Sequence, residues 1–493
     1  RRCEDACTRG RVDAAVAIDE VKKFIAQRDL DAATRYVPPV VTPTRAGGFD
    51  QKIAIIGAGP AGLSCAFYLA EKGYKPVVFE KNECPGGMLT YGIPSFKLQK
   101  DVIEAEVEII RLMGAEFRYG VEVGRDVTLD ELRAQGFKAF YVAIGCQGGR
   151  LAGIPGEDAE DVTVAVDFLR EVNSGKIDAL PGRTIVVGGG NVAIDVARNA
   201  CRLGSEHVEM FCLESEAQMP ASEEERREAV EDGAHISCGW GPKEIHLDEA
   251  GRVCGITFKR CTRVFDDEGR FAPEYDENDL RRVDADRVVM SIGQSIVWGD
   301  LLAGSKVELG RGQGALADPQ TYQTAEPDIF VGGDVYTGPS FAIDAIAAGH
   351  EAAVSIHRFV QPGSTLTIGR NQRHYTALDR DDVVIESYDN ASREVAHVDR
   401  EREKAAPFSE YVETFTEEQV RAETARCLGC GASIVDPNKC IGCGLCTTKC
   451  AFDAIHLDRD RPECSTMVKY EQKLPSLGKY ALKRAIKIKF GKK

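Results

Sequence analysis

The sequence predicts an α/β protein in which one strand–turn–helix unit occurs twice, and three observations support this fold class. An apolar run at 53–56 leads into a glycine-rich turn at 57–62, after which apolar residues recur at helical spacing. The same order returns at 184–187 and 188–191. Cysteines are then concentrated in 427–464. These observations predict two Rossmann-like domains, the second inserted in the first, followed by a cysteine-rich domain.

The turn at 57–62 has the residue types that a dinucleotide site needs. Gly57 allows a tight turn, Gly59 lets a pyrophosphate approach the backbone, and Gly62 lets the helix pack on its strand. The helix N-terminus can then hold phosphates, and Glu80, at the end of the next strand, can accept hydrogen bonds from ribose hydroxyls. We therefore predict a dinucleotide site here. A glycine-rich turn without a ligand is the alternative.

Three further segments are predicted to follow in this first domain. The loop 84–96 is rich in glycine and proline, and suits a bulky ring that lies against backbone. An amphipathic helix is predicted over 99–113. The apolar strand 137–145 ends in Gly145, as expected where a parallel strand meets a cofactor.

The second copy of the unit differs from the first in a way that bears on nucleotide choice. Its second strand is followed by Glu214. A carboxylate at this place binds an unmodified ribose 2′-hydroxyl and repels a 2′-phosphate, which favours NAD(H) over NADP(H). Arg226 and Arg227 follow further on and could be recruited to a phosphate, although a solvated helical face is the simpler interpretation.

The chain then returns to the first pattern. Residues 251–293 predict short strands, an acidic hairpin and a last apolar strand that ends at Gly293. A further strand over 329–331 meets a Gly-Gly-Asp turn, and a helix follows. Asp334 of this turn can accept a hydrogen bond from a sugar-like chain, and the helix N-terminus can meet a phosphate or the ring oxygens of a flavin.

The cysteines near the end of the chain fall into two motifs, RCLGC and KCIGCGLCTTKC. The Cys-x2-Cys-x2-Cys spacing of the second motif is typical of a [4Fe–4S] cluster. Cys450 can join Cys427 and Cys430 in a second site, with Cys464 as a fourth ligand for either. Zinc on Cys427 and Cys430 is the competing interpretation. Ala451 stands where proline usually follows the last cysteine.

The start of the chain carries a second, smaller pair of cysteines. Cys3 and Cys7 precede a predicted helix that Asp13 can cap, and prolines then lead into an extended linker. A pair of buried thiols is the alternative. The sequence begins at Arg1 without a methionine, so we expect that this pair belongs to a larger set of ligands.

Composition excludes several classes of protein. A net charge of −16 argues against nucleic-acid binding. No apolar stretch reaches the roughly 18 residues that a membrane helix needs. The 17 cysteines, without a recognisable secretory signal, favour a reducing compartment, so we expect a cytoplasmic protein. The basic tail 467–493 could dock on a partner, or it could be a solvated face.

These motifs together resemble the small subunit of bacterial glutamate synthase and its relatives. Those relatives include the large subunit of NADH-dependent ferredoxin:NADP oxidoreductase and the amino-terminal half of dihydropyrimidine dehydrogenase. The resemblance runs from Cys3 to about Phe359 through CEDAC, GAGPAGLSCA, GGMLTYGIPSFKL, GGGNVAIDVAR, EAQMPAS and GGDVYTGPSFAIDAIAAG. It implies FAD on the first glycine turn, Glu80 and Asp334, a nicotinamide nucleotide on the second turn, and amino-terminal cubanes to which Cys3 and Cys7 contribute.

The motifs and the resemblance give a committed set of sites and boundaries. The predicted cofactor-binding residues are Gly57, Gly59, Pro60, Ala61, Gly62, Glu80, Lys81, Gly87, Leu89, Ile93, Gly145, Gly188, Gly190, Asn191, Val192, Glu214, Gly293, Gly333, Asp334, Ser340 and Ala342. The predicted metal ligands are Cys3, Cys7, Cys427, Cys430, Cys440, Cys443, Cys446, Cys450 and Cys464. The predicted parts are a helical iron–sulfur segment (1–45), the FAD domain (46–150 and 301–365), the NAD(H) domain (151–300), a linker (366–420), a ferredoxin-like domain (421–466) and a basic tail (467–493).

Three departures from the family pattern matter. Relatives that use NADPH carry paired arginines where this chain has Leu213 and Glu214, which supports NAD(H). Lys22 stands where several relatives place a Glu or Gln ligand of one amino-terminal cluster, and an ammonium cannot ligate iron. The Cys440 segment is an addition to the simple glutamate synthase subunit, and indicates a chain built into a larger electron-transfer complex.

The function that the sequence predicts is electron transfer between NAD(H) and iron–sulfur clusters or ferredoxin, with other subunits of a redox complex as partners. A nicotinamide delivers hydride and a cubane takes single electrons, so a flavin must lie between them. A bifurcating flavin subunit that uses NADP(H) is the alternative. A disulfide reductase would need a cysteine pair near the flavin, and Cys84, Cys146 and Cys212 are single in the sequence. A structural electron-wire subunit would be expected to have a broken nucleotide motif.

Overall fold

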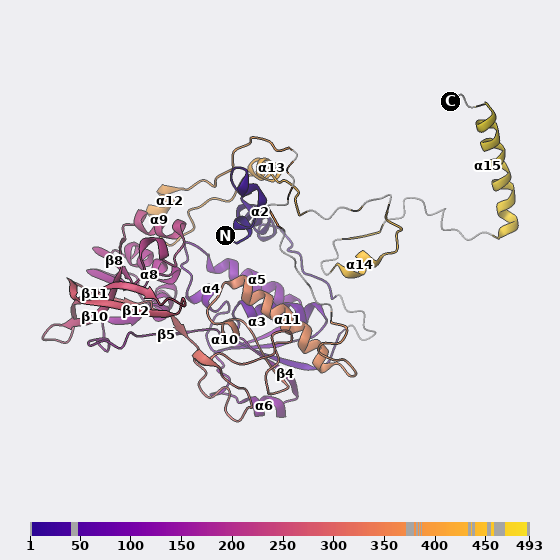
Figure 1. Cartoon of the computed structure of the whole chain (residues 1–493). Coiled ribbons are helices and arrows are strands. Elements are labelled where there is room, and N and C mark those ends of the chain that lie inside the picture. The colour runs from indigo at the N-terminus through magenta and orange to yellow at the C-terminus, as the bar shows by residue number, and fades with distance from the viewer. Residues whose placement is uncertain are drawn as a thin grey trace. The chain divides into compact units, whose positions relative to one another are not determined.

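The computed structural model describes residues 2–40, 48–370, 379–380, 383, 385, 387–431, 435, 439–450, 455–457 and 469–490. The chain divides into two compact units (Figure 1). The first comprises Arg1–Ala377 and Val384–Leu428, and the second comprises Leu378–Val383 and Gly429–Lys493. Among the described residues, no helix is both long and apolar enough to cross a membrane.

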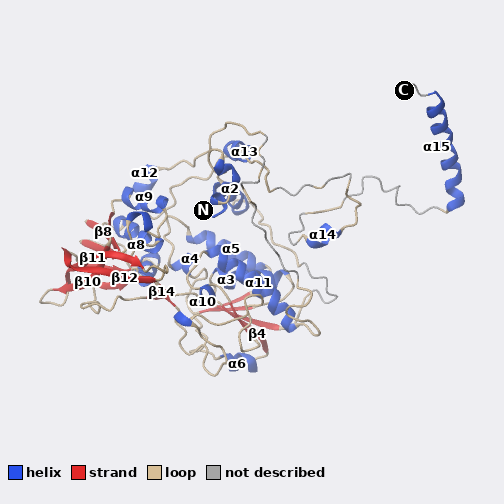
Figure 2. Ribbon diagram, viewed as in Figure 1, coloured by secondary structure: helices blue, strands red, loops and turns tan. Residues whose placement is uncertain are grey.

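The first sheet of the larger unit is parallel, with strand order β15-β4-β1-β2-β3. Its strands are β1 (Lys52–Ile56), β2 (Val77–Glu80), β3 (Glu116–Tyr119), β4 (Phe137–Val142) and β15 (Ile329–Val331). Its central strands read as continuous apolar runs because both faces are covered. Ile53 and Ile55 of β1 pack with helices α3 (Pro60–Glu71) and α11 (Ala342–Val360), whereas Ala54 and Ile56 pack on the side of α6 (Leu129–Ala134). Figure 2 shows α3 and α11 together on one side of β4 and α6 on the other.

The second sheet is also parallel, with strand order β6-β13-β7-β8-β9. Its strands are β6 (Val162–Val164), β7 (Arg183–Val187), β8 (His207–Cys212), β9 (His235–Cys238) and β13 (Arg287–Met290). Helices α7 (Ala165–Asn173), α8 (Asn191–Arg202) and α9 (Glu223–Glu231) cover one face. The other face packs on an antiparallel sheet of β10 (Trp240–Leu247), β11 (Val253–Phe265) and β12 (Phe271–Val283). Strands β11 and β12 are thus longer than the short strands that the sequence predicts.

The second domain is inserted in the first, as the sequence predicts. The chain leaves the first sheet after β4 and rejoins it through β15, which pairs with β4. Both crossings lie side by side, because β5 (Gly148–Gly149) on the way out pairs antiparallel with β14 (Gln294–Ser295) on the way back. The fold class is therefore confirmed.

The N-terminal residues pack with a segment from the far end of the larger unit. Helix α2 (Ile18–Leu30) packs against α13 (Glu417–Ala425) and against α1 (Arg2–Asp5), and Figure 1 shows α2 beside α13. Helix α12 (Arg400–Ala405) precedes α13 in the chain. The sequence predicts a linker up to residue 420, but 387–428 belong to the larger unit. Their polar side chains make buried ion pairs, which hydrophobic periodicity does not reveal.

Asp13 does not cap helix α2, contrary to the sequence prediction. The N-cap residue is Ala17, and α2 begins at Ile18. Asp13 instead accepts hydrogen bonds from the side chains of Arg9 and Arg426. The Asp13 carboxylate therefore binds two guanidinium groups, and it does not cap the helix N-terminus as the sequence alone would suggest.

The smaller unit contains α14 (Leu445–Lys449) and α15 (Tyr470–Phe490). Every residue of α15 is exposed. The basic tail is therefore helical over Tyr470–Phe490. The remaining helices of the chain are α4 (Met88–Tyr91), α5 (Lys100–Leu112), α10 (Asp334–Thr337) and the 3₁₀ turns Thr8–Arg11, Glu216–Gln218 and Arg311–Gln313.

Candidate functional site

The glycine turn after β1 is built so that only glycine fits at two places. Gly57 has φ +103°, and a Cβ there would lie 2.5 Å from the carbonyl oxygen of Ala143. A Cβ at Gly62 would lie 1.9 Å from the carbonyl oxygen of Gly57. A Cβ at Gly59, in contrast, would meet nothing within 4 Å. The N-terminus of α3 therefore faces open space, which is where a phosphate would lie.

Glu80 ties the second strand to this turn. Its side chain is buried and accepts hydrogen bonds from the backbone N–H of Ala58 at 2.8 Å and of Asn82 at 2.9 Å. A carboxylate oxygen can accept more than one hydrogen bond. The fixed carboxylate can therefore still accept from a ribose hydroxyl at the end of the pocket.

A pocket of about 470 Å³ extends from Glu80 to the N-terminus of α11. Fifteen of the predicted residues line it: Gly57, Gly59, Pro60, Ala61, Glu80, Gly87, Leu89, Ile93, Gly145, Asn191, Val192, Gly333, Asp334, Ser340 and Ala342. Lys81 lines a small adjoining cavity that shares Glu80 and Gly145 with it. Gly62 lines neither, because its position serves the packing of helix on strand.

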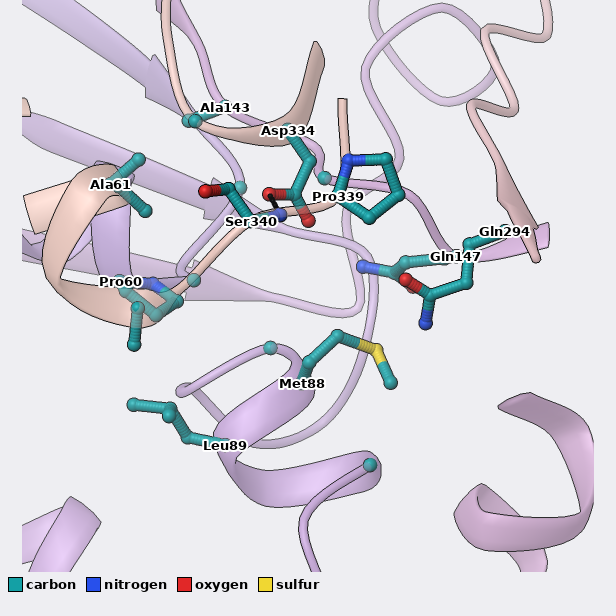
Figure 3. Close-up of a pocket in the computed structure, with 18 of the residues that line it drawn as sticks. Pro60, Ala61, Met88, Leu89, Ala143, Gln147, Gln294, Asp334, Pro339 and Ser340 are labelled. Carbon is teal, nitrogen blue, oxygen red and sulfur yellow. Dashed lines mark hydrogen bonds between the residues drawn. The ribbon is translucent and has the colours of Figure 1, made fainter. Parts of the chain in front are cut away.

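The far end of this first pocket is formed by α10 and α11. The Ser340 N–H donates to Asp334 Oδ1 at 3.2 Å, as Figure 3 shows. Burial raises the pKa of Asp334 above its usual value. The fit to a flavin rests on these groups: a glycine cradle with open space at one end, the buried carboxylate of Glu80, the half-buried carboxylate of Asp334 at the other end, and apolar walls between them.

Sequence reasoning missed twelve residues that line this pocket, among them Met88, Gln147, Gln294 and Pro339. Figure 3 shows the side chains of Gln147 and Gln294 next to one another. They are brought together by the pairing of β5 with β14. Each glutamine lies one or two residues after a glycine that ends a predicted strand. The pattern of an apolar strand followed by glycine could therefore have indicated both.

A second pocket, of about 680 Å³, lies at the glycine turn of the inserted domain. All six predicted residues line it: Gly188, Gly190, Asn191, Val192, Glu214 and Gly293. A Cβ at Gly188 would lie 2.2 Å from the carbonyl oxygen of Ser291, which repeats the relation of Gly57 to Ala143. A Cβ at Gly190 would meet nothing within 4 Å, as at Gly59. Lys259 and Tyr275, on the β11–β12 hairpin, also line this pocket and carried no signal in the sequence.

The two pockets meet. Asn191, Val192, Gln294 and Pro339 line both of them. The two pockets therefore adjoin at these residues. Direct contact between two redox groups is what hydride transfer requires.

Arg226 and Arg227 do not line the second pocket in the part of the chain that the structure describes. Arg226 donates to the carbonyl oxygen of Glu216 at 2.8 Å, and Arg227 pairs with Glu231 at 3.5 Å. Arg227 is exposed, which agrees with the solvated-face interpretation of this helix, whereas Arg226 is only partly exposed and its Nε is buried.

Cys212 is not single, contrary to the sequence prediction. Its Sγ lies 3.7 Å from the Sγ of Cys238, because the two residues are register partners on β8 and β9. Burial raises the pKa of Cys212, as expected for a thiol in apolar surroundings. The pair adjoins the second pocket, and no cysteine is among the described residues that line the first.

The predicted metal ligands lie in both units. Cys440, Cys443 and Cys446 are exposed, and Cys464 lies outside the described residues. Gly442 and Gly444 between them have φ of +66° and +77°, so the backbone wraps as a cubane loop would. Within the described residues, no three Cys, His, Asp or Glu side chains gather as ligands of a metal ion. The fit to a cluster therefore rests on thiolate chemistry and spacing.

Cys3 is exposed and lies near a lysine. The Nζ of Lys22 is 4.0 Å from the Sγ of Cys3 and 2.7 Å from the carboxylate of Asp19. The pKa of Lys22 is raised, mainly by its hydrogen bond to Asp19. A charged ammonium therefore occupies the place that the resemblance assigns to a ligand.

Comparison with known families decides the classification. The profile of the pyridine nucleotide-disulphide oxidoreductase family matches residues 51–349, which is more than half of the chain. The chain belongs to this family. A 4Fe-4S binding domain profile matches residues 433–456, which implies a [4Fe–4S] cluster. The family implies in turn that the chain binds a flavin and a nicotinamide nucleotide.

Relatives confirm the resemblance. The chain is 34% identical to the beta subunit of NADP(+)-dependent formate dehydrogenase from Moorella thermoacetica, over 87% of this chain but 63% of that protein. It is 34% identical to the glutamate synthase [NADPH] small chain of Escherichia coli, over 73% of this chain and 78% of that one. FprA from Mycobacterium tuberculosis, solved in complex with NADPH, has the same fold, with a TM-score of 0.54 and 19% identity over 63% of this chain and 84% of that one.

Proposed function

We propose that the chain is a flavin-containing subunit of a larger redox enzyme and moves electrons between NAD(H) and iron–sulfur clusters. The observation that supports this most directly is the meeting of the two pockets at Asn191, Val192, Gln294 and Pro339. FAD, when bound, exchanges hydride with a nicotinamide and single electrons with a cluster, and so connects the two. The formate dehydrogenase and glutamate synthase relatives are each named as one subunit or chain of a redox enzyme.

The chain's own residues have three tasks in this proposal. Gly59, Glu80 and Asp334 hold FAD in the first pocket. Gly190 and Glu214 hold the nucleotide in the second. The four shared residues keep the nicotinamide against the ring and exclude water from the contact.

We propose NAD(H) as the nucleotide because Glu214 lines the second pocket. The names of the formate dehydrogenase and glutamate synthase relatives contain NADP(+) and NADPH. The family resemblance implies paired arginines in relatives that use NADPH. This chain has Leu213 and Glu214 at those positions. Lys259 is the described cation that lines the pocket, and its Nζ is held by Glu277 at 2.8 Å.

We propose a ferredoxin, or another iron–sulfur or flavin subunit, as the electron partner, and a cytoplasmic location. The [4Fe–4S] domain matched at 433–456 supports the first proposal, since a cluster close to the surface can exchange electrons with another protein. Exposed cysteines at Cys440, Cys443 and Cys446 agree with a cluster of this kind.

The proposal is tested by anaerobic addition of NADH to the purified protein that contains flavin and iron. We expect flavin absorbance to fall first and the electron paramagnetic resonance signal of a reduced cluster to follow. Flavin that neither NADH nor NADPH reduces would contradict the proposal. If the flavin is reduced and the cluster stays oxidised, the chain carries out hydride transfer without passing electrons to the cluster, and that part of the proposal is wrong.

A further inference from the structure

The proposed function leaves one proton to be removed in each cycle. Oxidation of one NADH supplies two electrons and one proton as hydride, and two clusters accept one electron each. The balance is NADH and two oxidised clusters giving NAD⁺, two reduced clusters and H⁺. The first pocket therefore needs a group that accepts this proton, and the inference below rests on the proposed function.

Asp195 is placed to be that group. It belongs to α8 of the inserted domain, yet it lines the first pocket beside Asn191 and Val192, at the meeting of the two pockets. Its side chain is 14% exposed. Its Oδ1 accepts a hydrogen bond from Lys97 Nζ at 2.6 Å, and among the described residues Oδ2 has no hydrogen-bond donor. Neither glycine turn uses this carboxylate.

A line of charged groups leads from Asp195 towards solvent. Lys97, in the segment between α4 and α5, contacts both Asp195 and Glu225. The exposed fraction rises along the line, from 14% for Asp195 to 21% for Lys97 and 25% for Glu225. Glu225 lies in the first turn of α9, whose N-terminal residues are exposed.

We propose that Asp195 accepts the proton released in the first pocket, and that Lys97 is a positioning residue which holds this carboxylate on the side where Glu225 lies. An O–H bond forms on Asp195 as the proton leaves the pocket, and breaks when the proton passes to water near Glu225. No further reactant is needed, since the clusters take both electrons.

The charges around Asp195 agree with this role. Burial raises its pKa to about 6, although Lys97 opposes the rise; Glu225 adds to it and Arg198 lowers it. Burial lowers the pKa of Lys100, on α5, to about 8, and the charge of Asp195 opposes this shift. A carboxyl group with a pKa near 6 binds a proton readily and still releases it at neutral pH. Below pH 6 it is already protonated, so proton release should slow as pH falls through this value.

The experiment uses the protein loaded with flavin and clusters, mixed with NADH in weak buffer, and follows proton release with a pH-indicator dye beside flavin absorbance. Asp195→Asn keeps the side-chain size and an oxygen acceptor for Lys97, so we expect it to fold and to retain flavin. We expect its proton release to be slower on the order of a hundredfold, with the pH dependence near 6 lost. Asp195→Glu should restore part of the rate. Asp167→Asn, an exposed carboxylate on α7, should behave as wild type.

A second measurement does not depend on turnover. The infrared difference spectrum between reduced and oxidised protein should contain a carboxylic-acid band that Asp195→Asn lacks. If the variant releases protons at the wild-type rate, or the band persists, Asp195 only holds the two domains together through Lys97 and the inference is wrong. If NADH fails to reduce the wild-type flavin, the proposed function fails first. The two failures are therefore distinguishable.

Discussion

The guanidinium of Arg9 donates a hydrogen bond to the carbonyl oxygen of Arg426 at 3.1 Å, across 417 positions of the chain. Both arginine side chains are 1% exposed. Asp13 accepts from both of them, and Glu423 accepts from Arg426. Since Cys7 precedes Arg9 by two residues and Cys427 follows Arg426, this buried network fixes the backbone beside two predicted cluster ligands.

Loss of one arginine from this network should loosen the N-terminal helices. In Arg426→Met, Glu423 keeps two backbone donors but loses its charged partner inside the protein. Breaking a buried ion pair in this way costs about 3–5 kcal/mol. The free energy of local opening at α2 should fall by this amount, so we expect the α2 amides to exchange their hydrogens faster than in wild type.

Arg421→Met is the matched control for this prediction. Arg421 lies on α13, which ends one residue before Arg426; its side chain is 76% exposed and pairs with Glu417 at 2.6 Å. A surface ion pair contributes about 0–1 kcal/mol, so exchange of the α2 amides should hardly change. Equal effects of the two variants would mean that the network does not hold the N-terminal segment.

Gly59→Val should remove FAD without unfolding the protein. Gly59 has φ −77° and ψ 179°, which valine adopts readily, and its Cβ would meet no other atom within 4 Å. The side chain would instead fill the space expected for the pyrophosphate. We expect the purified variant to lack flavin absorbance while its thermal unfolding midpoint stays near that of wild type. Asp334→Ala should deplete flavin too, by removing a polar anchor.

Gly190→Val provides the comparison, because a Cβ there also meets nothing within 4 Å. This variant should keep its flavin and lose tight binding of the nicotinamide nucleotide, seen as slow flavin reduction at a given NADH concentration. If Gly59→Val retained flavin and Gly190→Val lost it, the assignment of the two pockets would be reversed.

The sequence predicts the glycine turns, Glu80 and Asp334 because strand, glycine and acid are neighbours along the chain. It does not predict Asp195, since a single acid in a helix carries no local signal and its partner Lys97 is 98 positions away. Gln147 and Gln294 become neighbours only through the β5–β14 crossing. The Arg9–Arg426 contact likewise leaves no hydrophobic periodicity in the sequence. Because the segment 387–420 is polar and lacks such periodicity, the sequence predicts it as a linker.

Cys443→Ser should remove one cubane and leave hydride transfer intact. The serine hydroxyl is a poor ligand for iron, and Cys443 is the middle cysteine of the Cys-x2-Cys-x2-Cys motif. We expect a loss of about four iron atoms per chain and of one electron paramagnetic resonance signal, while NADH still reduces the flavin. Cys84→Ser, an exposed cysteine outside both motifs, is the control. Unchanged iron content in Cys443→Ser would exclude this residue as a ligand.

Glu214 should make the protein prefer NADH to NADPH. A 2′-phosphate beside this carboxylate meets like-charge repulsion and loses the ribose hydrogen bond, and a hydrogen bond to a charged group is worth about 1.5–3 kcal/mol. At about 1.4 kcal/mol per factor of ten, this corresponds to roughly tenfold to a hundredfold discrimination. Flavin reduction by each nucleotide in stopped flow measures it directly.

Substitutions at Glu214 separate this explanation from others. Glu214→Ala should weaken NADH binding and relieve the penalty on NADPH, whereas Leu213→Arg with Glu214→Arg should favour NADPH by giving the phosphate two donors. Glu216→Ala, an exposed acid two residues away, should leave the preference unchanged. Faster reduction of the wild type by NADPH would contradict the Glu214 argument. Lys259 would then be the cation to remove, because it lines the pocket and Arg226 and Arg227 do not.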